Sequence, residues 1–153
     1  MKQLLIVAHA PSENTRLMAE AVVNGVNHPD IEGIACRWLP PLEATPEDLL
    51  GCDGIILGTT ENLGYMSGAL KDFFDRCYYP CLVLKEGLPC ALYVRAGYDG
   101  TGTCRAVETI CTGLRWSWIQ PPLVCKGEWD SEFLKQCETL GTTMAAGLEM
   151  GVY

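Results

Sequence analysis

The sequence predicts an α/β fold in which a parallel sheet carries helices on both faces, within a single domain over residues 1–153. Short apolar runs begin near residues 3, 31, 53, 89 and 117, and segments with helical periodicity lie between them. This alternation is typical of βαβ units, whose strands run parallel. No repeat or linker marks a domain boundary, and a chain of 153 residues can bury a core of its own.

The first half of the chain alternates buried strands with amphipathic helices. An apolar run predicts a strand over 3–8, and apolar residues at helical spacing predict a helix over 14–27. A rougher apolar pattern predicts a second strand over 31–39, and a short helical turn is expected over 46–50. The next apolar run predicts a third buried strand over 53–58.

The second half begins with the helix that we expect to be the longest, over 67–84. Pro80 should kink or end this helix, because proline lacks the N–H group that the helix needs. An apolar run predicts a fourth strand over 89–94, and a helical pattern predicts a helix over 103–113.

A fifth strand is expected over 116–124, and the last helix follows it. Pro121 and Pro122 place this strand at the edge of the sheet, because proline cannot donate to a neighbouring strand. Ser131 is a preferred capping residue and is expected to begin a helix that ends near Met150.

Composition and charge exclude several classes of partner. The net charge of −8 argues against nucleic acid, which requires a basic surface. No apolar run approaches the roughly 20 residues of a membrane span, and no signal peptide is evident, so we expect a cytoplasmic protein. The nine cysteines are scattered without a Cys-x-x-Cys motif, which favours small buried apolar residues over a metal or redox site.

Residues 9–16, between the first strand and the first helix, carry groups that suit a phosphate. A helix N-terminus supplies N–H donors and a favourable field, and Ser12, Asn14 and Thr15 add side-chain donors. The same residue types are the preferred caps of any helix, so the segment is either a phosphate loop or an ordinary helix start.

Three neighbours of these residues have less certain roles. His9 either donates to a phosphate or ring, or is simply satisfied at the end of the strand. Glu13 must turn away from a dianion, and Arg16 either adds positive charge or points outward from the first helical turn.

Residues 58–68 follow the third strand and suit a flat ring lying beside that phosphate. The ten-residue connection is longer than the usual 2–6 residues, and Gly64 permits close backbone approach. The alternative is a solvent-facing connection whose tyrosine packs on the core. The residues predicted to bind the ring are Thr59, Thr60, Glu61, Asn62, Leu63, Gly64 and Tyr65.

A third loop follows the fourth strand and is expected to meet the far edge of the ring. It offers Gly97, Tyr98 and Asp99, although a flexible surface loop would have a similar composition. Arg95 precedes the loop and either attracts the phosphate of a nicotinamide cofactor or pairs with a surface carboxylate. A phosphate site beside a ring site predicts flavin mononucleotide (FMN).

The segment that most resembles a known family is residues 58–75, GTTENLGYMSGALKDFFD. It is similar to the ring-binding loop and helix of the NAD(P)H-dependent FMN reductases and flavin quinone reductases, with Thr60 where a proline usually stands. Gly64, Ser67, Lys71 and Asp75 keep the spacing of that pattern. Residues 9–15 resemble the phosphate loop of the same flavodoxin-like superfamily.

The resemblance implies a flavodoxin-like, doubly wound, five-stranded sheet in the order 2-1-3-4-5 that binds FMN without a covalent bond. It further implies an oxidoreductase that takes electrons from NADPH or NADH and passes them to a small-molecule acceptor such as a quinone, a flavin or a nitro compound. A flavodoxin-type electron carrier and a cofactor-free binding module are the alternatives. Trp116, Trp118 and Trp129 belong either to the core, which we favour, or to a possible homodimer surface.

Overall fold

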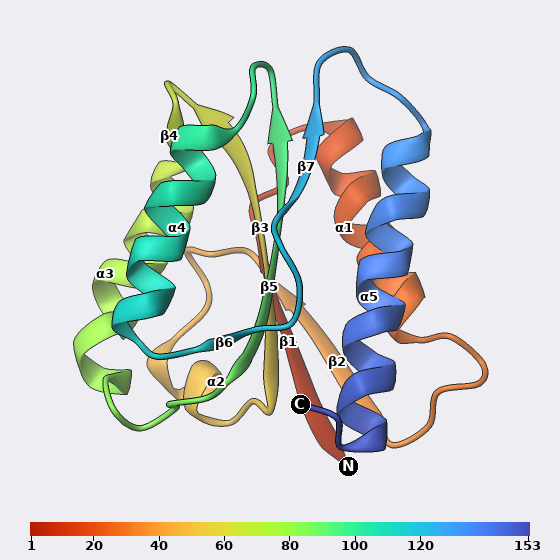
Figure 1. Cartoon of the computed structure of the whole chain (residues 1–153), viewed down its shortest axis with the longest axis vertical. Coiled ribbons are helices and arrows are strands. Elements are labelled where there is room, and N and C mark those ends of the chain that lie inside the picture. Colours follow the sequence, from red (N-terminus) through yellow and green to blue (C-terminus); the bar gives the residue numbers. More distant parts are fainter.

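A parallel sheet forms the centre of the molecule, and helices cover both of its faces (Figure 1). The computed structural model describes residues 1–153. The strand order is β2-β1-β3-β5-β6, with β7 continuing beside β5, so β6 and β7 share the fifth place of the expected order 2-1-3-4-5. The parallel strands are β1 (Lys2–Ala8), β2 (Ile34–Leu39), β3 (Gly54–Asn62), β5 (Pro89–Ala96), β6 (Ser117–Trp118) and β7 (Leu123–Lys126).

The helices divide between the two faces of the sheet, as expected. One face carries α1 and α5, and the other carries α3 and α4, with α2 at the lower end of the view (Figure 1). Their bounds are α1 (Glu13–Val26), α2 (Pro46–Leu50), α3 (Gly68–Cys81), α4 (Thr101–Gly113) and α5 (Glu132–Met150). The prediction that the helix after the third strand is the longest was wrong, because α3 ends just after Pro80 and α5 has 19 residues.

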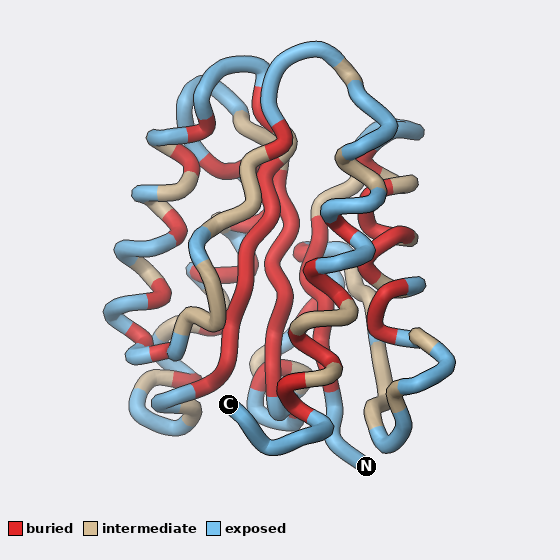
Figure 2. The backbone as a smooth tube through the Cα atoms, turned by 45° about the vertical axis from the view of Figure 1, so that its right-hand side comes forward, coloured by how far each residue is buried: buried red, intermediate tan, exposed pale blue.

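The central strands are buried on both faces, and Figure 2 shows them as the continuous buried interior. Leu5 and Val7 of β1 face the core beneath α3 and α4, whereas Leu4 and Ile6 face the core beneath α1 and α5. This arrangement explains why the strand reads as an unbroken apolar run. Trp116 is also buried, in the first of these cores, as we favoured for this residue.

Most of the cysteines are buried apolar residues, as the scattered pattern predicts. Seven of the nine lie in the interior, and Cys36 and Cys104 are partly exposed. Burial raises the pKa of Cys36 to about 11, so this thiol is protonated at neutral pH.

The second and fifth predicted strands differ from the structure in ways that glycine and proline explain. The second strand begins at Ile34, because Gly33 adopts a positive φ of 73° that interrupts the extended chain. The predicted fifth strand over 116–124 is divided into β6 and β7, with Pro121 and Pro122 between them. Both pieces pair with β5 at the sheet edge, as the prolines predict.

The start of α5 corrects the expected role of Ser131. Ser131 occupies the N-cap position, but its side chain makes no capping hydrogen bond. The Asp130 carboxylate instead accepts from the N–H of Glu132 at 2.9 Å.

Helices α1 and α5 pack closely enough that glycine is required at their crossing. A Cβ atom on Gly141 would lie 2.2 Å from the carbonyl oxygen of Val22, and one on Gly25 would lie 2.0 Å from that of Glu138. The hydroxyl of Thr142 donates to the Gly25 carbonyl at 3.0 Å across the same crossing. The contact therefore involves backbone against backbone, which cannot yield as a flexible side chain can.

We expect Gly141→Ala to destabilise the protein, because the added methyl group must push α5 away from α1. Overpacking of this kind costs about 1–3 kcal/mol, which urea denaturation would measure as a lower free energy of unfolding. Gly68→Ala is the matched control, because a Cβ at this helical glycine would meet no atom within 4 Å. Equal stability of the two variants would contradict the prediction.

Candidate functional site

The segments predicted to bind a ligand all leave the same edge of the sheet, at the top of Figure 1. Ala8 of β1 lies opposite Gly58 of β3, and Gly58 lies opposite Tyr93 of β5. The N–H of His9 then donates to the Gly58 carbonyl at 2.9 Å, which extends the pairing by one residue. Parallel strands in this register bring the three following segments side by side.

Ser12 and Thr15 at the start of α1 form a reciprocal capping box. The Ser12 hydroxyl accepts from the Thr15 N–H at 3.2 Å, and the Thr15 hydroxyl accepts from the Ser12 N–H at 3.0 Å. Thr15 is buried, whereas Ser12 and Asn14 are exposed. Ser12 and Thr15 therefore cap α1. The remaining N–H groups of the first helical turn have no partner within the helix.

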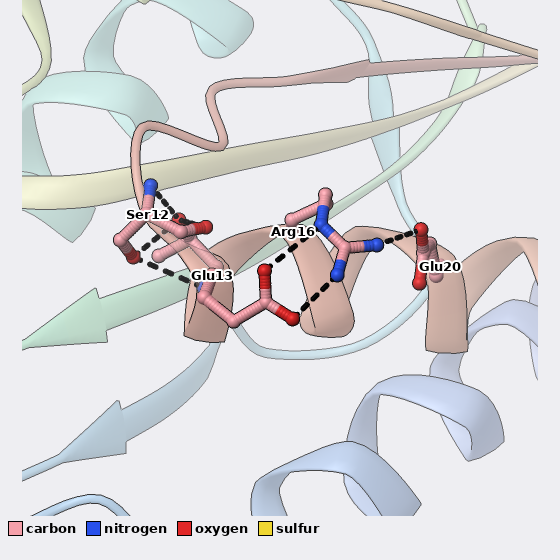
Figure 3. A network of polar contacts seen from close by, with 5 residues as sticks. Ser12, Glu13, Arg16 and Glu20 are labelled. Atoms are coloured by element: carbon pink, nitrogen blue, oxygen red, sulfur yellow. Dashed lines mark hydrogen bonds and ion pairs between the residues drawn. The ribbon is translucent and has the colours of Figure 1, made fainter.

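The guanidinium of Arg16 is engaged by carboxylates of its own helix, α1. Its guanidinium lies between the carboxylates of Glu13 and Glu20 and pairs with both, as Figure 3 shows. These hydrogen bonds raise the pKa of Arg16. The arrangement also holds the Glu13 carboxylate beside Arg16, so an anion at the helix start would depend on backbone N–H groups for its attraction.

His9 lies at the junction between β1 and the loop and is partly exposed. Burial lowers its pKa below the ordinary value of 6.5, so the imidazole is neutral at pH 7. A neutral imidazole has one donor and one acceptor nitrogen, and it adds no positive charge to the loop.

The second predicted segment is a hairpin rather than the ten-residue loop that we expected. β3 continues to Asn62, the chain turns at Leu63 and Gly64 with φ angles of 54° and 73°, and β4 (Tyr65–Met66) returns antiparallel. The extension continues the register of β3 beside β5 as far as Thr60. The apolar pattern could not reveal it, because the extended residues are polar.

Local hydrogen bonds engage three of the predicted ring-binding side chains, those of Thr59, Thr60 and Asn62. The Thr59 hydroxyl is buried, accepts from the Ser67 N–H at 2.9 Å and donates to the Thr60 carbonyl at 2.9 Å. The Thr60 hydroxyl donates to the Asn62 side chain at 2.8 Å. The tip instead exposes apolar surface, since Leu63 is fully exposed and Tyr65 is 41% exposed.

The third predicted segment, residues 97–100, joins β5 to α4. Asp99 accepts from the Thr101 N–H at 3.0 Å, which lowers the pKa of Asp99. Gly100 adopts a left-handed conformation with φ of 70°, and Tyr98 is 86% exposed. Tyr98 is therefore free to meet a ligand, whereas the Asp99 carboxylate already accepts from the turn that begins α4.

Glu61 joins the hairpin to this third segment. Its carboxylate accepts from the N–H groups of Tyr98 and Gly100, each at 2.8 Å. The prediction assigned Glu61 to the edge of a ring, and the structure places the carboxylate oxygens on backbone donors of the neighbouring loop.

Two residues in the first turn of α4 also contact the hairpin, and sequence reasoning did not find them. The Thr103 hydroxyl donates to the Tyr65 carbonyl at 3.0 Å. A Cβ on Gly102 would lie 2.1 Å from the carbonyl oxygen of Gly64, so the hairpin backbone rests on this glycine. The only sequence signal was a glycine just before a predicted helix, and glycine is common in turns of every kind.

Arg95 holds the β7–α5 connection and forms no ion pair. Its guanidinium donates to the carbonyls of Ala96, Cys125 and Gly127 at 2.7–3.0 Å. It also lies over the rings of Trp129 and Phe133, at 5.8 and 5.1 Å from their centres. The alternative in which Arg95 pairs with a surface carboxylate was therefore wrong.

The Tyr93 hydroxyl is buried below this edge without a hydrogen-bond partner. It packs against Gly58, where a Cβ atom would lie 2.4 Å from the hydroxyl oxygen. Burial raises the pKa of Tyr93, so the phenol remains neutral.

The architecture defines the flavodoxin-like fold. A solved archaeal flavodoxin superposes with a TM-score of 0.78 at 18% identity, over 95% of this chain and 98% of that chain. Among curated proteins, a flavodoxin from Aquifex aeolicus is 37% identical over 75 residues, which are 49% of this chain and 40% of the relative.

A second curated relative is an NAD(P)H dehydrogenase (quinone) from Acidithiobacillus ferrooxidans. It is 29% identical over an alignment of 94 residues, and the match covers 50% of this chain and 47% of the relative. The chain therefore aligns with less than half the length of either curated relative, and no family model matches it. None of the helices combines the length and the apolar character needed to cross a membrane.

We expect Tyr93→Phe to stabilise the protein, because the buried hydroxyl loses its hydration on folding and gains no hydrogen bond in return. The gain should be about 1 kcal/mol in the free energy of unfolding, measured by urea denaturation. A loss of stability in Tyr93→Phe would show that the hydroxyl has a partner in solution.

His9 should make the native state less stable in acid. Because burial lowers the pKa of folded His9 below 6.5, the unfolded chain binds the proton more readily. The stability that depends on neutral His9 is fully present above pH 6.5. It is lost as the pH falls through 6.5 and then through the lower pKa of the folded state. Urea unfolding across this range should show a shallower pH dependence in His9→Gln, with His28→Gln as the control for removing an imidazole.

Proposed function

We propose that the chain binds FMN at this edge and acts as an NAD(P)H-dependent oxidoreductase that reduces a small acceptor such as a quinone, a free flavin or a nitro compound. The observation that carries the proposal is the juxtaposition of a helix start suited to phosphate with a rim of exposed aromatic and apolar side chains. Tyr65, Leu63 and Tyr98 form that rim, along the edge from which α1 also begins.

Open space beside three glycines at this edge supports the proposal. A Cβ atom on Gly64, Gly68 or Gly97 would meet no other atom within 4 Å, so these glycines face open space beside the rim. Backbone N–H and carbonyl groups at such positions can approach a ligand closely. The site therefore offers both the polar edges and the packing surfaces that a flavin ring requires.

Each part of the site has a distinct role in this proposal. Bound FMN would supply the hydride and electron chemistry. The first turn of α1 would hold the phosphate through its N–H groups, with Ser12 and Asn14 at the exposed positions. The hairpin tip and Tyr98 would pack against the ring, and its open side would admit the donor and the acceptor in turn.

A flavodoxin-type electron carrier is the second candidate function. The net charge of −8 suits weak docking to a basic partner, and the similarity to the Aquifex flavodoxin points the same way. In this case the protein would exchange electrons with a partner protein and would react poorly with NADPH or NADH.

The visible absorption spectrum of the protein separates these functions. Protein that is incubated with FMN and desalted should retain the spectrum of oxidised flavin, and this spectrum should bleach on anaerobic addition of NADPH or NADH. Retained flavin that does not bleach would favour the carrier. Loss of flavin on desalting, together with no binding in a fluorescence titration, would favour the cofactor-free binding module. Riboflavin, which lacks the phosphate, is the matched ligand and should bind more weakly than FMN.

Tyr98→Ala should weaken FMN binding about tenfold, because an aromatic packing partner of the ring is lost. The measurement is a titration by flavin fluorescence. Tyr79→Ala is the control, since Tyr79 is similarly exposed, at 79%, but lies at the far end of α3. Equal affinities of the two variants would show that Tyr98 does not meet the ring.

A further inference from the structure

One carboxylate connects the two segments that would hold the ring. Glu61 lies on the extension of β3, opposite Met66 in the hairpin register, and this pairing fixes the position from which its side chain leaves. Its two oxygens accept separately, one from the Tyr98 N–H and the other from the Gly100 N–H, each at 2.8 Å. Hydrogen bonds to an ionised acceptor are stronger than those between neutral groups.

The loop that receives this carboxylate has few other restraints. It contains glycine at positions 97 and 100, and Gly97 faces open space. Its other local hydrogen bonds run from the Thr101 N–H to Asp99 and from the Cys104 N–H to the Gly100 carbonyl. Both fix the turn into α4, and neither involves Tyr98. The Glu61 contacts therefore define where the backbone of Tyr98 lies.

The hairpin is also anchored to the first turn of α4, so Glu61 extends from a segment that is itself held in place. Thr103 donates to the Tyr65 carbonyl, and Gly102 meets the Gly64 backbone. The hairpin thus rests on α4 while its carboxylate holds the loop that precedes α4. These three contacts join β3, β4, the 97–100 loop and α4 to one another.

We propose that Glu61 is a positioning residue, which fixes the 97–100 loop and so presents Tyr98 at the rim of the site. The inference rests on the proposed function, in which the rim binds the ring of FMN. It differs from the expectation that Glu61 binds the ring edge, because each of its oxygens accepts from a backbone donor of the loop.

Three substitutions of Glu61 separate the effect of side-chain length from the effect of charge. Glu61→Gln keeps the length but has one acceptor oxygen, so it retains one of the two hydrogen bonds. Glu61→Asp keeps the charge but is one methylene group too short for the loop. Glu61→Ala loses both properties. Glu108→Ala is the control, because Glu108 is an exposed carboxylate on α4 without an ion pair.

The first measurement is amide hydrogen exchange at Tyr98 and Gly100 in the protein without FMN. We expect exchange to accelerate about tenfold or more in Glu61→Ala and less in Glu61→Gln, whereas Glu108→Ala matches wild type. The second is FMN affinity by fluorescence titration. We expect wild type to bind FMN most tightly and Glu61→Gln next, with Glu61→Asp and Glu61→Ala weakest, at an affinity about tenfold below wild type.

The outcomes distinguish this inference from the proposed function. Unchanged exchange at both amides in Glu61→Ala would overturn the inference alone. If exchange accelerated in Glu61→Ala while its FMN affinity stayed at the wild-type value, the inference would also be overturned. Loss of the Glu61 contacts would then loosen the loop without weakening binding of the ring. If Glu61→Asp bound FMN as tightly as wild type while Glu61→Gln bound as weakly as Glu61→Ala, the inference would also be overturned. The charge at this position, rather than the length of the side chain, would then determine affinity. A wild-type protein that does not bind FMN, while exchange still accelerates in Glu61→Ala, would overturn the proposed function.

Discussion

The burial of β1, β3 and β5 on both faces is the constraint on which the rest of the structure depends. Each strand contributes alternate side chains to two separate cores, so a shift of one residue in register would exchange the contents of the cores. Ala8 must therefore lie opposite Gly58, and Gly58 opposite Tyr93. The loops that follow these strands therefore begin at the same edge of the sheet, and residues far apart in the chain lie close together there.

Hydrogen bonds among the loop residues then fix the backbone at that edge of the sheet. The hydroxyls of Ser12 and Thr15 cap α1, Asp99 caps the turn into α4, and Glu61 holds the loop beside the hairpin. Polar groups that sequence reasoning assigned to a ligand thus support the backbone first. Such pre-organisation lowers the entropy that is lost when a ligand orders its site.

The sequence predicted the sheet and its helices well because apolar periodicity records burial, and burial decides both. It failed where polar residues continue a strand: Thr60 and Asn62 belong to β3, but no apolar pattern identifies them. It also could not anticipate long-range partners. The contact of Gly102 with Gly64 and the bonds from Glu61 to the 97–100 loop depend on how separate segments meet in space. Residue type was thus a good guide to which segments meet at this edge and a poor guide to what each side chain contacts.

The charges around α1 determine how an anion could be recognised there. Arg16 is paired with Glu13 and Glu20, His9 is neutral at pH 7, and the whole chain carries −8. At long range the protein therefore repels a dianion, and solvent ions screen that repulsion over about 10 Å. Attraction begins only at hydrogen-bond distance, where the N–H groups of the first helical turn point outward. A site of this kind selects its ligand by fit to the backbone rather than by net charge, which is consistent with a nucleotide held by its phosphate and its ring together.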